Sequence, residues 1–467
     1  MFVNRERELN LLEQCYASSR AELFVLYGRR RVGKTELLRA FCRGKRHIFY
    51  VSDLGTEASS LAEFTRQISG FVFGQAEALS PFASWDAAFA FLATQAATER
   101  LVVIIDEFTY LIDANNAIPS ILQRLWDTQL QQTRLMLVLC GSYVGLMEQH
   151  VLAYRAPLYG RRTGQWQLHP LTFWNAALLL PNYSFEDLVR AYAVLGGIPA
   201  YIQQFDAQQS LLTNITENIL TQGRFLHDEP RFLLLQELRD PSRYFSVLQA
   251  IAGGRTRLNE IAQGAGIPTS SISFYLNTLQ EMGLIERAVP ATESQPHKSR
   301  QGIYRILDHY FRFWFRFIFP NRSLLQRGEV EQVCAQIEAE LEQFVGLAFE
   351  SICREFVWKE YREGRLGFTP QTVGSWWGRN EEIDVVAIGD DAILLGECKW
   401  TSKPVGDNLL ADLERKAHSV LSQGHWHTVY YAHFSRSGFT PSVIARKDSD
   451  EALLLVTPDL ILDKSQV

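Results

Sequence analysis

No two cysteines in this sequence stand at the CxxC spacing, and no apolar run approaches the length of a membrane span. The six cysteines are scattered through 467 residues, which argues against a zinc ribbon or a disulfide framework and suits a reducing compartment. The most apolar aromatic run, residues 311–319, contains two arginines, whereas a spanning helix needs about 20 apolar residues. We therefore expect a packing or interface segment there, and no membrane partner.

An excess of positive charge is also absent, since the formal net charge is −6. The molecule as a whole therefore does not attract polyanions, and nucleic-acid binding would have to come from local basic patches. The N-terminal segment is charged from Arg5 onward, which is unlike a secretory signal, so a cytoplasmic protein is expected. The hydrophobic fraction of 47% is ordinary for a globular protein, and the chain length predicts two to four domains.

Short apolar runs alternate with helix-compatible segments over the first 170 residues, which is typical of an α/β fold with a parallel sheet. Four runs are continuous, as expected for strands buried on both faces: residues 22–28, 47–52, 101–106 and 135–142. A mainly helical segment follows these runs. Beyond it come a helix–helix–helix–wing pattern and a second α/β stretch.

A glycine-rich loop follows the first predicted strand and fits G-x-x-x-x-G-K-[ST]. Its residues are Gly28, Arg29, Arg30, Arg31, Val32, Gly33, Lys34 and Thr35, with Glu36 next in the helix that follows. The glycines permit the tight path that turns successive backbone N–H groups toward phosphate oxygens, and the helix N-terminus adds its positive dipole end. Lys34 supplies a cation to the β- and γ-phosphates, and Thr35 offers its hydroxyl to Mg²⁺.

A pair of carboxylates follows the third predicted strand, where the apolar run 101–105 ends in Asp106 and Glu107. Asp106 can hold Mg²⁺ with Thr35, and Glu107 can polarise the attacking water. Such a pair after a strand is, by itself, also compatible with a solvated loop. Combined with the glycine-rich loop, it predicts an ATP–Mg²⁺ site.

The segments FVNRERELNLLE, LYGRRRVGKTELL, VVIIDEF and LCGSYVGLM resemble prokaryotic ATPases of the AAA+/STAND kind, in the archaeal-type branch. The resemblance covers about residues 1–240. It implies a polar sensor at Ser142, a sensor or finger arginine at Arg161 or Arg162, and a base-contacting Gly-x-Pro element at Gly197–Pro199. It also implies that Asn4, Arg5 and Glu6 flank the adenine. The Gly-x-Pro string could instead be only a helix C-cap and turn, and the arginines could be ordinary surface residues.

Residues 241–307 predict a winged helix, with a wing tip near residues 290–300. Ser270, Ser271 and Ser273 lie early in its third helix, the position that enters the major groove in DNA-reading winged helices. That helix contains no lysine or arginine, and phosphate affinity requires several. The module could therefore contact DNA, bind a protein partner, or only relay nucleotide state between domains.

The C-terminal α/β stretch contains Asp384 in one strand pattern and Glu397 with Lys399 in the next. Strand alternation places Glu397 and Lys399 on one face and turns Cys398 to the opposite, core face. Two carboxylates can hold a divalent metal beside a lysine that orients or activates water, and Glu350 in the preceding helix could add a third. The alternative is that Glu397 and Lys399 form an ion pair on a solvated face of the strand. His425 and His427 lack a third ligand at suitable spacing and are expected to be an exposed strand end.

This arrangement resembles the PD-(D/E)xK nuclease superfamily over residues 335–440, which implies Mg²⁺ or Mn²⁺ at Glu350, Asp384 and Glu397, and Lys399 as a catalytic group. The pattern continues with a helix near 405–422 and a strand at 427–433. Some members of that superfamily keep the fold after losing catalysis.

Together these patterns predict five segments: a P-loop ATPase core (1–180), a helical lid (181–240), a winged helix (241–307), a helical connector (308–334) and a restriction-endonuclease-like α/β domain (335–467). The leading hypothesis is an ATPase whose nucleotide state controls a DNA-cleaving domain. The first alternative is a signalling or scaffold ATPase with an inert terminal binding module. The second is an AAA+ motor, which would require assembly into a homo-oligomer.

Overall fold

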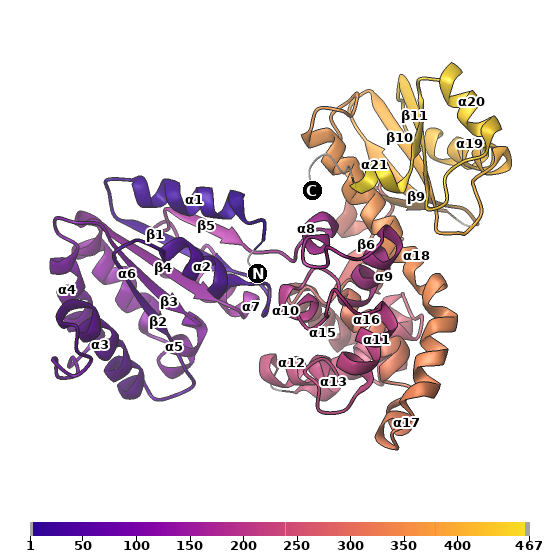
Figure 1. Cartoon of the computed structure of the whole chain (residues 1–467). Coiled ribbons are helices and arrows are strands. Elements are labelled where there is room, and N and C mark those ends of the chain that lie inside the picture. Colours follow the sequence, from indigo (N-terminus) through magenta and orange to yellow (C-terminus); the bar gives the residue numbers. More distant parts are fainter. Residues whose placement is uncertain (1–2, 239, 379, 463–467) are drawn as a thin grey trace. The chain divides into compact units, whose positions relative to one another are not determined.

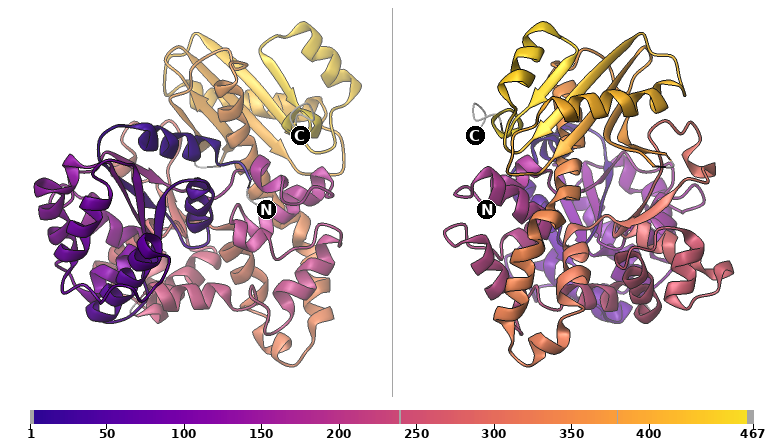
Figure 2. Two further views of the ribbon diagram at one scale, coloured as in Figure 1. Left: turned by 60° about the vertical axis from the view of Figure 1, so that its left-hand side comes forward. Right: turned by 90° about the vertical axis from the view of Figure 1, so that its right-hand side faces the viewer.

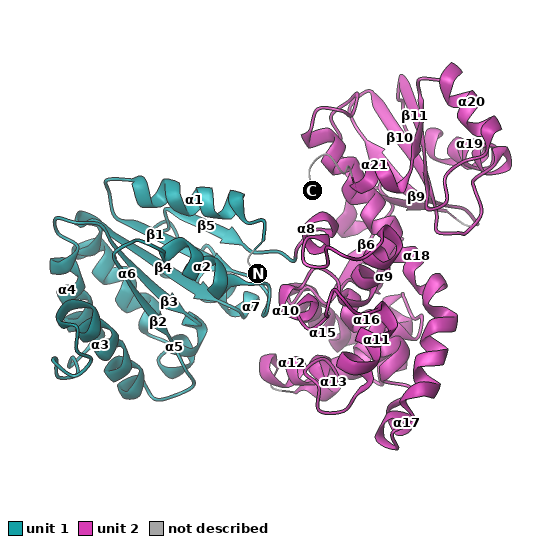
Figure 3. Ribbon diagram, viewed as in Figure 1, with its two compact units in different colours: residues 1–170 teal, residues 171–467 magenta. Residues whose placement is uncertain are grey.

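The computed structural model describes residues 3–238, 240–378 and 380–462. They fall into two compact units, residues 1–170 and 171–467 (Figure 3). The first unit therefore ends at Pro170, whereas the sequence predicted an ATPase core extending to residue 180. Among the described residues, no helix is both long and apolar enough to cross a bilayer.

The first unit contains a five-stranded sheet of order β2-β3-β4-β1-β5, in which every neighbouring pair is parallel. Its strands are β1 (Glu22–Tyr27), β2 (His47–Val51), β3 (Leu101–Asp106), β4 (Leu135–Gly141) and β5 (Gly164–Gln167). The four predicted strands are confirmed, and every residue of β1, β3 and β4 is buried. Strand β5 was missed because its sequence, GQWQ, contains no apolar run.

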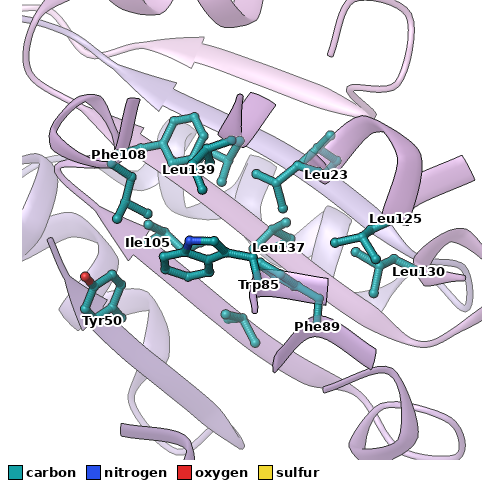
Figure 4. Packing of buried hydrophobic residues seen from close by; sticks show 14 of the residues in the cluster. Leu23, Tyr50, Trp85, Phe89, Ile105, Phe108, Leu125, Leu130, Leu137 and Leu139 are labelled. Carbon is teal, nitrogen blue, oxygen red and sulfur yellow. The ribbon is translucent and has the colours of Figure 1, made fainter. Parts of the chain in front are cut away.

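Helices cover both faces of this sheet (Figure 1). The helical elements are α1 (Glu6–Ala17), α2 (Lys34–Cys42), α3 (Glu57–Phe73), α4 (Trp85–Gln95), α5 (Phe108–Ala114), α6 (Ile118–Thr128), η1 (Leu130–Gln132), α7 (Val144–Met147) and η2 (Glu148–Leu152). Trp85 and Phe89 of α4 pack in one buried cluster with Ile105 and Leu137 of the sheet (Figure 4). This core holds β3 and β4 rigidly, and with them the carboxyl ends that carry the predicted site residues.

The second unit begins with a helical region made of α8 (Phe173–Ala177), α9 (Phe185–Leu195), α10 (Pro199–Ile202), α11 (Leu211–Ile215), η3 (Thr216–Leu220) and α12 (Glu229–Glu237). The winged helix follows as α13 (Pro241–Ala252), α14 (Leu258–Ala265), α15 (Thr269–Glu281), β6 (Ile285–Ala288), η4 (Pro296–Lys298) and β7 (Ile303–Ile306). Strands β6 and β7 pair antiparallel as the wing. The predicted order of three helices and a wing is confirmed.

The aromatic run at 311–319 is a packing segment, as expected. It forms α16 (His309–Phe313) and η5 (Trp314–Ile318), and Phe311, Phe313 and Trp314 are almost fully buried. The short α17 (Arg322–Gln326) leads into α18 (Val330–Arg362). Because α18 is one continuous helix of 33 residues, the predicted boundary at 334/335 lies inside a helix. Figures 1 and 2 show α18 running from the helical region to the C-terminal sheet.

The C-terminal sheet has the order β12-β11-β10-β9-β8. Its elements are β8 (Thr372–Trp377), β9 (Glu382–Ile388), β10 (Ala392–Lys399), α19 (Asp407–Leu421), β11 (Thr428–Ser435), α20 (Pro441–Ser449), β12 (Leu453–Val456) and α21 (Pro458–Leu462). Strands β8, β9 and β10 are antiparallel, and β10, β11 and β12 are parallel. The predicted helix and strand after Lys399 are therefore α19 and β11.

Candidate functional site

The glycine-rich loop connects the carboxyl end of β1 to the N-terminus of α2. Gly33 is the N-cap of α2 with φ of 96°, and Gly28 has φ of 149°. A Cβ at Gly28 would lie 2.4 Å from the carbonyl oxygen of Leu168, so only glycine fits this path. Lys34 is buried, and its Nζ donates to the carbonyl oxygens of Gly28 (2.8 Å) and Arg29 (3.0 Å). The ammonium group is thereby held inside the loop that would surround a phosphate.

The predicted carboxylate pair, Asp106 and Glu107, lies beside this loop. The Thr35 hydroxyl donates to Asp106 Oδ2 at 2.6 Å, and the Ser142 hydroxyl donates to Glu107 Oε1 at 2.7 Å. Glu107 has φ of 53°, and its N–H donates to Asp106 Oδ1 at 3.0 Å. The ends of β3 and β4 and the start of α2 therefore bring together four residues from three separate segments of the chain.

These groups fit a magnesium ion and an attacking water. Mg²⁺ prefers oxygen ligands and keeps several waters, and a hydroxyl and a carboxylate already lie in direct contact at Thr35 and Asp106. Glu107 Oε2 is buried and has no hydrogen-bond partner in the part of the chain that the structure describes. An unsatisfied buried carboxylate oxygen is costly, and a water positioned for attack would satisfy it.

The two candidate arginines lie in the first unit and are engaged. Arg161 Nε and Nη2 donate to the Asp127 carboxylate at 2.9 and 2.7 Å, and its Nη1 donates to backbone carbonyls. Arg162 contacts the Gln165 side chain and the carbonyl oxygen of Leu152. Neither geometry tests a role at the γ-phosphate, so these assignments stay predictions.

The side chain of Arg5 supports the glycine-rich loop, although Arg5 lies outside the loop motif. Its buried guanidinium donates to the carbonyl oxygens of Val32 (3.1 Å) and His169 (3.0 Å) and pairs with Glu8 at 3.2 Å. The pKa of Arg5 is lowered by burial and restored in part by Glu8. The place of Arg5 beside the adenine, which the resemblance implies, stays a prediction, and its side chain supports the backbone of the phosphate loop.

The Gly-x-Pro element belongs to the second unit, so its base-contacting role stays a prediction. Its glycine has a separate structural reason. A Cβ on Gly197 would lie 1.8 Å from the carbonyl oxygen of Leu171, whose N–H donates to the Gly197 carbonyl at 2.7 Å. Pro199 starts α10.

A second constellation lies where β9 and β10 part. Their pairing ends at Val385 opposite Gly396, and beyond this point the amide of Cys398 donates to the side chain of Asp384, at Oδ2, over 2.8 Å. Burial, followed by the charges of Glu397 and Glu350, raises the pKa of Asp384 to about 7. When the pKa of a carboxyl group is raised in this way, a nearby cation stabilises the ionised form of the group.

Glu397 is buried and held by two lysines. Lys399 Nζ lies 2.7 Å from Glu397 Oε1, and Lys416 Nζ of α19 lies 3.2 Å from Glu397 Oε2. Lys416 was missed by the sequence analysis, because four residues after Asp412 it looks like half of an exposed helical ion pair. Cys398 is buried as predicted. His427 is exposed, 3.6 Å from Asp391.

The three predicted metal-binding carboxylates, Glu350, Asp384 and Glu397, lie on α18, β9 and β10. The described residues contain no group of three or more His, Cys, Asp or Glu that could hold a metal ion. Glu350 pairs with Arg354 at 3.6 Å, and burial raises its pKa. Metal binding by Glu350, Asp384 and Glu397 stays a prediction, and the charges of Glu397 and Glu350 both act on Asp384.

The parallel sheet, the glycine-rich loop and the linked carboxylates together define a P-loop ATPase domain. Residues 2–205 match the family described as an ATPase domain predominantly from Archaea. The chain belongs to the family of the uncharacterized protein MJECL04 of Methanocaldococcus jannaschii, to which it is 35% identical over 426 residues, covering 90% of this chain and 92% of that protein.

Other comparisons cover parts of the chain. Residues 241–288 match an IclR helix-turn-helix domain, and residues 314–416 match a family of archaeal and bacterial proteins of unknown function. The uncharacterized ATP-binding protein MJ0423 of M. jannaschii is 52% identical over 46 residues, 10% of this chain and 78% of that protein. The Walker-type ATPase PABY2304 of Pyrococcus abyssi shares the fold, with a TM-score of 0.53 and 23% identity over 68% of this chain and 96% of that one.

Proposed function

We propose that this protein hydrolyses ATP and uses its nucleotide state to control a C-terminal nuclease-like domain acting on DNA. The observation that carries the ATPase part is the contact network of Thr35, Asp106, Glu107 and Ser142 around the phosphate loop. Lys34 neutralises the β- and γ-phosphates, and Thr35 and Asp106 hold Mg²⁺, which supplies charge neutralisation at the phosphates. Glu107 orients the attacking water, and the Ser142 hydroxyl holds Glu107 in place.

In the nuclease-like domain, Asp384 and Glu397 would hold Mg²⁺ or Mn²⁺, and Lys399 would stabilise charge on the phosphate undergoing cleavage. The raised pKa of Asp384 supports this role, since a metal ion would favour its ionised form. When Lys399 moves toward the substrate, Lys416 would still neutralise part of the negative charge of Glu397.

DNA is the proposed partner of the winged helix, which matches a helix-turn-helix family. Ser270 and Ser271 are exposed at the start of α15. Arg257 donates to the carbonyl oxygens of Arg300 and Gly302, so two basic residues lie together at the wing, the element that would meet the DNA backbone. A protein partner at the same module is the alternative.

One observation favours the inert-module reading of the C-terminal domain. Both lysines pair with Glu397, and the described part of the chain offers no three-ligand metal group. A carboxylate neutralised by two ammonium groups is a stable structural arrangement without a metal. The signalling or scaffold ATPase therefore stands as the second candidate.

Two assays separate these candidates. For the ATP site, Lys34→Ala should abolish measurable ATP binding by calorimetry; wild-type affinity in this variant would refute the site. For cleavage, DNA cutting with Mg²⁺ or Mn²⁺ should be lost in Asp384→Ala and Lys399→Ala, and should differ with and without ATP. Lys403→Ala, an exposed lysine just after β10, is the matched control and should cut normally. Equal cutting in all variants would point to a contaminant, and no cutting by any would favour the binding module.

A further inference from the structure

The third helix of the winged helix, α15, exposes a stripe of uncharged side chains. Its buried face is anchored in the core of the module by Ile272, Tyr275, Leu276 and Leu279. The exposed stripe follows the helical spacing of three and four residues and consists of Ser270, Ser273, Phe274 and Asn277. Phe274 is 66% exposed. The stripe therefore offers hydroxyl and amide groups and one aromatic ring to a partner.

The buried residues next to Phe274 fix its position on the surface. The Phe274 ring meets the Tyr275 ring edge to face, with the ring centroids 5.4 Å apart. Tyr275 packs in the same way on Tyr244 of α13, at 4.9 Å. The hydroxyl of Tyr275 accepts from Nη1 of Arg243 at 2.9 Å. Arg243 is more than half exposed, so a cation stands beside α15.

The positive charge of the module lies outside the stripe. Residues 241–307 contain seven lysines and arginines and four aspartates and glutamates, a net charge of +3, whereas the whole chain has −6. The ion pairs among the described residues of the module join Arg243 to Asp240 and Arg305 to Glu286. Four further cations are exposed: Arg255, Arg257, Lys298 and Arg300. Cations around an uncharged helix face suit DNA, because phosphates take the charge and base edges take neutral side chains.

We propose that α15 reads adjacent A·T pairs in the major groove of DNA. The Phe274 ring packs against the C5 methyl group of thymine, and the Asn277 amide pairs with N6 and N7 of adenine, the contacts that side-chain geometry favours. The two residues are three positions apart, about 4.5 Å along the helix axis, which is close to the ~3.4 Å step between bases. Glu281, the acidic residue of α15, is its last residue, beyond the N-terminal part that contacts bases.

A protein partner fits this surface less well. The buried centre of a protein interface is apolar and poor in charge, whereas the stripe contains one apolar side chain among four and is flanked by cations. The inference rests on the proposed function, because it takes DNA as the partner of the winged helix. It adds the bases that the helix recognises and the two side chains that recognise them.

Selection from a pool of random DNA duplexes tests the sequence preference. The full chain binds the pool without a divalent metal, so that no DNA is cut, and the bound duplexes are sequenced. We expect a shared motif that contains adjacent A·T pairs. Asn277→Ala should lower the preference for this motif over an unrelated duplex by roughly fivefold or more, because the amide is the group that pairs with adenine.

Replacing thymine by uracil in the selected duplex removes the methyl group and leaves the protein unchanged. The wild-type protein should lose about fourfold in affinity at one position, since one methyl contact is lost. Phe274→Ala should bind the two duplexes equally. Phe232→Ala changes an exposed phenylalanine of α12 and should behave as the wild type does.

Lys298→Gln separates base readout from backbone binding. Lys298 is exposed in the wing, so this variant should weaken binding to every duplex alike and reduce the salt dependence. A pool without a shared motif, or the same effect of uracil on the wild type and on Phe274→Ala, overturns base reading by α15. Salt-dependent binding to all duplexes would then keep DNA as the partner. Binding to no duplex overturns both proposals and favours a protein partner.

Discussion

At the scale of single residues, buried charged groups decide how the two constellations are held. Arg5 is the clearest case in the first unit, because its guanidinium joins the phosphate loop at Val32 to the segment after β5 at His169. A hydrogen bond from a charged donor contributes about 1.5–3 kcal/mol. The loop geometry therefore depends on a side chain outside the motif.

We expect Arg5→Ala to weaken ATP binding roughly tenfold, because the carbonyl of Val32 would lose its charged donor and the loop its fixed path. Arg7→Ala is the matched control, since Arg7 lies exposed on the same helix. Calorimetry with ATP–Mg²⁺ measures both. Equal affinities in the two variants would show that the loop keeps its shape without Arg5.

The raised pKa of Glu355 in α18 predicts that the stability of the protein depends on pH. Burial raises its pKa from 4.5 to about 7, offset in part by hydrogen bonds from the Phe173 amide and the Tyr192 hydroxyl. The folded state therefore holds a proton that the unfolded state has already lost between about pH 4.5 and 7. Stability from this group is present below pH 4.5 and is lost as pH rises through 7.

Glu355→Gln should remove this dependence and stabilise the protein at pH 8 by about 2 kcal/mol, somewhat less than the full shift because the side chain is partly exposed. Thermal unfolding of both proteins at pH 5 and pH 8 gives the comparison. An unchanged difference between the two pH values in the variant would show that Glu355 titrates normally.

At the scale of elements, close backbone approaches decide which residues a turn accepts. The turn between α9 and α10 passes the start of α8 so closely that Gly197 leaves no room for a Cβ beside Leu171. Its glycine is thus required by packing, whatever the Gly-x-Pro string does for a nucleotide.

Gly197→Ala should destabilise the second unit by roughly 1–3 kcal/mol through steric overlap. Gly346→Ala, in the interior of α18 with no atom within 4 Å of the added Cβ, should be neutral or stabilising by about 0.5–1 kcal/mol. Denaturant unfolding measures both. Unaltered stability of Gly197→Ala with weakened ATP binding would assign this glycine to the nucleotide and not to the turn.

The elements also show the limits of periodicity. The buried strands β1, β3 and β4 were predicted because continuous apolar runs report burial on two faces. Strand β5 pairs with β1 at the sheet edge, and its four residues are mostly half-exposed. Strand β5 therefore forms by pairing with β1, and such pairing leaves no hydrophobic pattern in the sequence of β5 itself. For α18, helical periodicity continued across a predicted domain boundary without marking it.

At the scale of the whole molecule, the motor alternative that follows from the AAA+ resemblance predicts assembly into a homo-oligomer. A finger arginine must be free to reach a phosphate on another subunit. Arg161 is held on both sides, by the Asp127 carboxylate and by the carbonyls of Pro157 and Tyr159. Arg162 has fewer contacts, to Gln165 and to Leu152.

We expect ATP-dependent self-association to be reduced at least tenfold in Arg162→Ala. Arg161→Ala and Asp127→Ala should behave alike, with lower thermal stability and unchanged assembly, because they break one ion pair. Sedimentation with and without ATP distinguishes them. Loss of assembly in Arg161→Ala but not in Asp127→Ala would identify Arg161 as the finger. Monomers under all conditions would remove the motor alternative.

The sequence by itself predicted the residues of the ATP site, because its motifs are local: glycines, lysine and threonine at fixed spacing, and a carboxylate pair ending an apolar strand. It also determined the order of the winged helix, since helical periodicity is a property of neighbouring residues. Only the tertiary structure decided that the Arg5 side chain donates to the backbone of the phosphate loop and that Lys416 joins Lys399 at Glu397. These contacts join residues from separate elements, and the burial that gives them their chemistry does not exist until the chain has packed.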